Sequence, residues 1–129
     1  MKIDVSIGEL VDKVTILSIK LKKIKNLEKL KNIRKEYELL KKPMEHIGIL
    51  ISSNEFRRLE EINLNLWEIE DKIRIKEAKK EFDDEFIQLA RSVYFKNDKR
   101  ADIKRQINLK YNSELLEEKE YVSYKVRNK

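Results

Sequence analysis

Apolar side chains recur in this sequence at alternating steps of three and four residues, which is the spacing of one face of a helix. The first such stripe consists of Ile7, Leu10, Val14, Leu17, Leu21 and Ile24. A helix with this pattern packs lengthwise against another helix. Only two Gly and one Pro occur among the 129 residues, so few turn signals interrupt the pattern and short strands are disfavoured. We therefore expect one all-α domain, an antiparallel bundle of four to five helices.

Capping signals place the first two helices of this bundle. Ser6-Ile7-Gly8-Glu9 has the form of a capping box, in which a hydroxyl precedes a carboxylate by three residues. Asn26 ends the first helix or caps the second, and the second is expected to stop near Pro43 because proline interrupts helices. The two helices would form an N-terminal helical hairpin with a lysine-rich outer face. Residues 44–53 are less regular, and we interpret them as a connector.

Similar signals begin the later helices. Ser52 to Glu55 predicts the start of a third helix, and Phe82 to Asp84 predicts a fourth, because carboxylates favour a helix N-terminus. Asn97-Asp98 is expected to break or kink the fourth helix, which would create a fifth. We assign residues 1–111 to the helical bundle domain and residues 112–129 to a charged C-terminal tail that could dock on it.

Composition excludes several classes of protein and site. The absence of Cys excludes disulfides, thiolate catalysis and Cys-based zinc sites, and it favours a reducing, cytoplasmic location. No apolar run approaches the roughly 20 residues of a membrane span, so we expect no membrane partner. One His cannot build a His-based metal site or readily support a Ser-His-Asp triad, and two separated glycines cannot form a phosphate loop.

Polar side chains follow the apolar stripes at helical spacing in three of the expected helices. In a bundle these lines could converge, so the sequence predicts a polar pocket between the first, third and fourth helices. The candidate ligand-binding residues are Asn63, Trp67, Arg74, Arg91, Tyr94, Asn97, Arg100, Lys104 and Asn108. The candidate supporting carboxylates are Glu9, Asp12, Glu70, Asp71 and Asp98.

The chemistry of this set favours an anionic, phosphate-containing small molecule, such as a nucleotide, a cyclic oligonucleotide or a nucleotide-sugar. The arginines and the lysine would meet phosphate, and the asparagines would supply directional hydrogen bonds. Trp67 or Tyr94 would stack on a base or a sugar ring. The carboxylates would hold the cations in place in the empty protein.

Each candidate also has a purely structural interpretation. Glu9 could serve only as the capping partner of Ser6, and Asn97-Asp98 could serve only as a helix cap. Trp67 could fill the core, and Glu70 with Arg74 could be an ordinary surface pair. Arg91 follows two apolar residues in the sequence and is expected close to the buried face, so its guanidinium needs an anionic partner. This is either a ligand or a bridge to Asp71 or Asp12.

Five blocks of the sequence carry a resemblance to a known family: Ile7 to Lys13, Leu66 to Asp71, Ala90 to Tyr94, Asn97 to Ala101, and Ser113 to Lys119. Together they resemble a small bacterial and viral domain family of unknown function, whose genes sometimes lie near polysaccharide-assembly genes. The resemblance covers nearly the whole chain and is weakest from Lys22 to Phe56. It implies no particular activity, but most of the candidate polar residues fall within its blocks.

Two other functions stay open. Glu9-x-x-Asp12 and Glu70-Asp71 are similar to the paired carboxylates of all-helical nucleotide pyrophosphohydrolases, which implies Mg²⁺ as a cofactor and hydrolysis of a nucleotide or phosphosugar. The net charge of +6 is concentrated between Lys20 and Lys42, which fits a basic scaffold or a nucleic-acid-binding protein. We expect a homo-oligomer for all three functions, including small-molecule binding, because helices with long apolar stripes readily pair.

Overall fold

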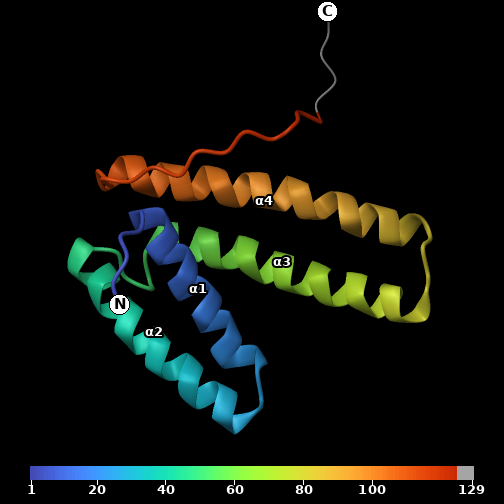
Figure 1. Ribbon diagram of the computed structural model, residues 1–129, viewed down its shortest axis with the longest axis horizontal. Helices are drawn as coiled ribbons and strands as arrows, with labels where there is room; N and C mark the ends of the chain where they lie inside the picture. The colour runs from blue at the N-terminus through green and yellow to red at the C-terminus, as the bar shows by residue number, and fades with distance from the viewer. Residues whose placement is uncertain (125–129) are drawn as a thin grey trace, which may run out of the picture.

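The computed structural model describes residues 1–124, and this part of the chain contains four α-helices and no strand. They are α1 (Ile7–Lys23), α2 (Leu27–Ile47), α3 (Asn54–Lys79) and α4 (Asp84–Lys110). Figure 1 shows α3 and α4 side by side along the length of the molecule, with α1 and α2 diverging from them. The all-α prediction is confirmed. None of the described helices combines the length and the apolar character that crossing a membrane requires.

Helix starts occur where the sequence predicted them, because each has a side chain that accepts from a first-turn amide. The Ser6 hydroxyl accepts from the amide of Glu9 at 3.1 Å, and the Ser53 hydroxyl accepts from Phe56 at 3.3 Å. At the start of α4, the Asp83 carboxylate accepts from the amide of Phe86 at 2.9 Å.

Two expected interruptions are wrong. Helix α2 runs through Pro43 to Ile47, because Met44 is fully buried in the core and Gly48 ends the helix one turn later at φ 101°. Helix α4 is continuous through Asn97-Asp98, so the described residues contain no fifth helix. Neither side chain caps a helix end there, since Asp98 accepts from the hydroxyl of Tyr124 and Asn97 lines a groove.

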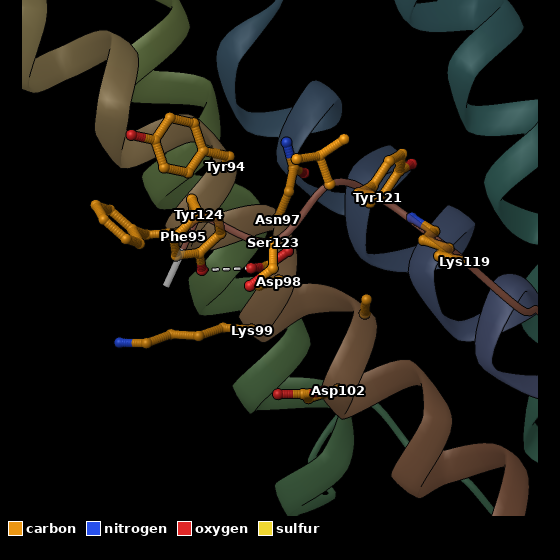
Figure 2. Close-up of a pocket in the computed structure, with 12 residues that line it drawn as sticks. Tyr94, Phe95, Asn97, Asp98, Lys99, Asp102, Lys119, Tyr121, Ser123 and Tyr124 are labelled. Atoms are coloured by element: carbon orange, nitrogen blue, oxygen red, sulfur yellow. Dashed lines mark hydrogen bonds between the residues drawn. The ribbon is translucent and has the colours of Figure 1, made fainter. Parts of the chain in front are cut away.

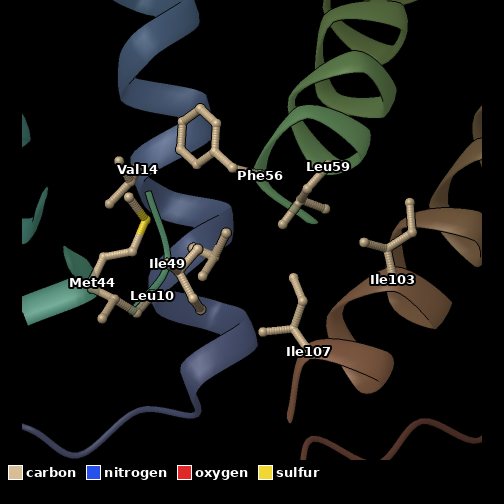
Figure 3. Close-up of a cluster of buried hydrophobic side chains, with 9 residues drawn as sticks. Leu10, Val14, Met44, Ile49, Phe56, Leu59, Ile103 and Ile107 are labelled. Atoms are coloured by element: carbon tan, nitrogen blue, oxygen red, sulfur yellow. The ribbon is translucent and has the colours of Figure 1, made fainter. Parts of the chain in front are cut away.

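Helix α1 is the central element of the fold. It packs on each of the other three helices, whereas α2 packs on α1 alone within residues 1–124. The apolar core lies where the first half of α1 meets the end of α2, the start of α3 and the end of α4 (Figure 3). Its fully buried side chains include Val14, Met44, Ile49, Leu59 and Ile107. The outer halves of α3 and α4 extend beyond this core as a two-helix arm (Figure 1).

Residues 112–124 form an extended segment along α4 (Figure 1). Arg105 pairs with Glu118 at 3.0 Å, and the Tyr124 hydroxyl donates to Asp98. This part of the predicted tail therefore lies on the helix. Residues 125–129 of that tail lie outside the described residues.

Candidate functional site

A buried ionic cluster joins α1, α3 and α4, and we call it the Asp12 cluster: Glu9, Asp12, Thr15, Asn63, Arg100 and Lys104. The side chain of Asp12 is 1% exposed and sits at its centre. Oδ1 of Asp12 accepts from Nδ2 of Asn63 and from Nε of Arg100, both at 2.9 Å. A second guanidinium N–H of Arg100 reaches Oδ2, so this pair is bidentate.

The hydrogen bonds of the cluster stabilise the charged form of the Asp12 carboxylate, which burial by itself would destabilise. Burial by itself raises the pKa of Asp12, but hydrogen bonds from Arg100 and Asn63 outweigh it and lower the pKa below its ordinary value. The pKa of Arg100 is raised, first by its hydrogen bond to Asp12. Asn63 also donates to Thr15 Oγ1 at 2.8 Å, and Thr15 in turn donates to the carbonyl of Asp12 at 2.7 Å.

Lys104 is the other cation of the cluster, and unlike Arg100 it is buried. Its Nζ lies 2.7 Å from Glu9 Oε2, 3.7 Å from Asp12 Oδ2 and 3.1 Å from Glu117 Oε2. Burial lowers the pKa of Lys104, but these three carboxylates more than offset it and the net change is upward. The side chain of Glu9 therefore joins α1 to α4 through Lys104, and Lys104 is held by carboxylates of the protein itself.

The start of α1 is fixed to the end of α4 by two hydrogen bonds. The amide of Gly8 donates to Asn108 Oδ1 at 2.6 Å, and the amide of Ile7 donates to Ser113 Oγ at 3.0 Å. The first-turn amides of α1 are thus used within the protein. Asn108, predicted as a ligand contact, is instead buried as a cap for α1.

An open groove lies beside the cluster, between α1, α3 and α4, and we call it the Trp67 groove. It has a volume of about 520 Å³ and adjoins the Asp12 cluster through Asn63 and Arg100, which belong to both. Its lining consists of Ile16, Ile19, Asn63, Leu66, Trp67, Glu70, Asp71, Arg74, Val93, Asn97 and Arg100. Seven of these side chains are among the predicted site residues.

The groove combines a half-buried apolar wall with exposed charges. Trp67 is partly buried, and Ile16 and Ile19 of α1 face the same space. Arg74 lies 3.8 Å from Glu70, and its side chain is 80% exposed. Because the two charged groups are far apart for an ion pair and are solvated, separating Arg74 from Glu70 costs little free energy. The side chain of Arg100 is 29% exposed and uses two of its five N–H donors on Asp12.

Three predicted residues lie away from the groove, on another side of α4. Arg91 is exposed and sits over the ring of Phe95 at 5.9 Å, and the expected bridge to Asp12 is made by Arg100. Tyr94 packs against Phe95 and Tyr124 with ring centroids 4.8 Å and 5.0 Å apart. With Asp98 and the C-terminal segment, these rings line a second cavity of about 940 Å³ (Figure 2).

Sequence reasoning missed three members of the site. Thr15 and Glu117 complete the hydrogen bonding of Asn63 and Lys104. Gly8 is required by close approach, since a Cβ there would lie 2.5 Å from the backbone oxygen of Lys104. A glycine in the first turn of an amphipathic helix was the available signal for this contact.

The four carboxylates considered for Mg²⁺ are dispersed. Glu9 and Asp12 pair with Lys104 and Arg100, while Glu70 and Asp71 line the groove. Among residues 1–124, no three His, Cys, Asp or Glu side chains are placed to share a metal ion.

The model of a family described as "Family of unknown function (DUF6165)" matches residues 1–126. No curated protein and no solved structure matches the chain.

Proposed function

The chain belongs to the DUF6165 family of unknown function, and on that premise we propose that the Trp67 groove binds a phosphate-containing small molecule. The observation that carries the proposal is a shared lining: an aromatic ring and two arginines face one space of about 520 Å³. Arg74 and the free edge of Arg100 would meet the phosphate. Trp67 would stack on a base or a sugar ring.

The acidic groups of the groove narrow the ligand class. Glu70 and Asp71 line the same space and would repel a molecule that is anionic along its whole length. Carboxylates do accept hydrogen bonds from hydroxyls, and Asn97 can both donate and accept. A nucleotide or a nucleotide-sugar, with hydroxyls beside its phosphate, therefore suits the groove better than inorganic phosphate.

The proposal has an architectural premise. The groove exists because α1 leans against α3 and α4 while continuing into its own partner, α2. We take α1 and α2 as an N-terminal hairpin and the whole as an antiparallel bundle. In this arrangement the Asp12 cluster holds Arg100 in place for the ligand. The ion pair between Arg100 and Asp12 keeps the free edge of the guanidinium oriented before the ligand binds.

Trp67 is the single tryptophan of the chain, so its fluorescence reports directly on the groove. We expect AMP, ATP or UDP-glucose to change this emission in a saturable titration. Arg74→Ala should weaken the binding about 10- to 100-fold, the usual range for a charge-assisted hydrogen bond. Arg91→Ala is the matched control, because that arginine is also exposed but lies outside the groove.

Two results would overturn the proposal. One is an emission that none of these ligands changes, and the other is equal loss of binding in both arginine variants. Turnover of the same ligands, measured with and without Mg²⁺, separates simple binding from hydrolysis.

A further inference from the structure

The densest excess of positive charge in the protein lies at one end of its fold. Residues 20–35, which we call the basic end, hold eight Lys or Arg side chains and one Glu, a net charge of +7. The whole chain carries +6, so all the remaining residues together carry −1. A charge kept only for solubility would be interspersed with the opposite sign, whereas this one is concentrated.

The basic end is also largely exposed. It comprises the last turn of α1, the turn at residues 24–26 and the first half of α2, and it projects away from α4 (Figure 1). Seven of its eight cations are exposed, and Lys20 is partly so. Within residues 1–124, none of the eight forms an ion pair. Elsewhere in the described residues, Lys76, Arg100 and Lys104 are paired with carboxylates, and exposed lysines such as Lys72 and Lys99 are not.

We propose that the basic end docks on the phosphate backbone of double-stranded nucleic acid. A cluster of unpaired lysines neutralises closely spaced phosphates and releases their counterions, which supplies binding energy without reading sequence. Phosphates of a duplex follow one another at short intervals, which matches lysines spread over two adjoining helices. This surface is separate from the Trp67 groove, so the two proposals stand or fall independently.

The side chains between the lysines argue against other polyanions. Single strands are bound through aromatic rings that stack on bases, and the stretch from residue 20 to residue 42 holds one aromatic, Tyr37, which packs on the core. A helix on an anionic bilayer needs a free apolar face. The apolar residues Leu30, Ile33 and Leu40 of α2 are partly buried and lie on one side of the helix with Tyr37. Leu27 and Leu39 are exposed, but they are about 18 Å apart along the helix and make no such face.

The test is fluorescence anisotropy of a labelled 20-base-pair duplex titrated with the full-length protein at several salt concentrations. We expect binding whose affinity falls steeply with salt and is the same for unrelated duplex sequences. The variant Lys22→Gln/Lys25→Gln/Lys31→Gln should lose roughly tenfold or more in affinity and flatten the salt dependence by about one unit of log–log slope per lysine that contacts phosphate.

The matched control removes the same charge elsewhere. Lys72→Gln/Lys79→Gln/Lys99→Gln changes three exposed lysines of α3 and α4 and should retain nearly the affinity of the unchanged protein. Circular dichroism verifies that both variants keep their helices. Equal loss in the two variants, absence of duplex binding at low salt, or tighter binding to vesicles containing phosphatidylserine than to the duplex would each overturn the proposal.

Discussion

The Asp12 cluster and the Trp67 groove are built from the same three helices and share Asn63 and Arg100, yet they treat charge in opposite ways. In the cluster every ion is paired at short range and Asp12 is excluded from water. In the groove the Glu70–Arg74 pair is long and solvated. The difference shows that burial decides what a charged side chain can do. Breaking a buried ion pair costs much free energy, whereas a solvated side chain can exchange its partner for a ligand.

The largest difference between the two regions should appear when Asp12 is removed. Asp12→Ala leaves Arg100 and Lys104 without their central anion, so we expect a loss of about 3–5 kcal/mol in the free energy of unfolding. Urea denaturation followed by circular dichroism measures it. Asp71→Ala, in the groove, is the control and should stay within about 0.5 kcal/mol. Similar losses in the two variants would show that depth does not divide the two regions.

Gly8→Ala tests the close contact beside the cluster. The added Cβ would meet a main-chain oxygen of Lys104, which cannot turn away as a side chain can. We expect a loss of about 1–3 kcal/mol, typical of overpacking, by the same denaturation measurement. An unchanged midpoint would mean that α1 can move away from α4 without cost.

Lowering the pH should destabilise the cluster, through protonation of Asp12, more than it affects the groove. The pKa of Asp12 is lowered in the folded protein, so its contribution is present above the unfolded pKa of about 4 and is lost as pH falls through the folded pKa. Each unit of lowering contributes about 1.4 kcal/mol. Urea midpoints measured from pH 6 to pH 2 should fall more steeply for the unchanged protein than for Asp12→Asn. Parallel curves would contradict this assignment.

The smallest effect belongs to the groove pair. A double-mutant cycle with Glu70→Ala and Arg74→Ala should give a coupling energy of about 0.3–0.5 kcal/mol, which added salt reduces. A coupling above about 1 kcal/mol would show that Glu70 holds Arg74 firmly, which would weaken the case for Arg74 as a ligand contact.

The helical fold was largely predictable because its signals are local. The caps at Ser6, Ser53 and Asp83 lie next to the stripes that they begin, and period alone identifies the helices. The continuation of α2 past Pro43 was not predictable, since it depends on the burial of Met44 by distant segments. Asn97-Asp98 misled for a similar reason: Asp98 accepts from Tyr124 of the C-terminal segment, and Asn97 lines the Trp67 groove.

The candidate site was predictable in composition more than in detail. Spacing along α3 placed Asn63, Trp67, Glu70 and Arg74 on one line, and all four line the groove. Arg91 failed because neighbours in sequence do not share a helix face: two residues from Val93 is about 200° around the helix. The choice of Arg100 as the partner of Asp12 depends on how two helices meet, which spacing within one helix cannot give.

The bonds from Gly8 to Asn108 and from Asp12 to Arg100 span 100 and 88 residues of chain. A ribosome adding about 5–20 residues per second takes roughly 5–20 s to supply these partners. During that interval the nascent N-terminal helix carries a carboxylate that no arginine has yet reached, and water must solvate it. Helix α4 therefore completes the hydrogen bonding of α1 only after about 100 residues of intervening chain have been made.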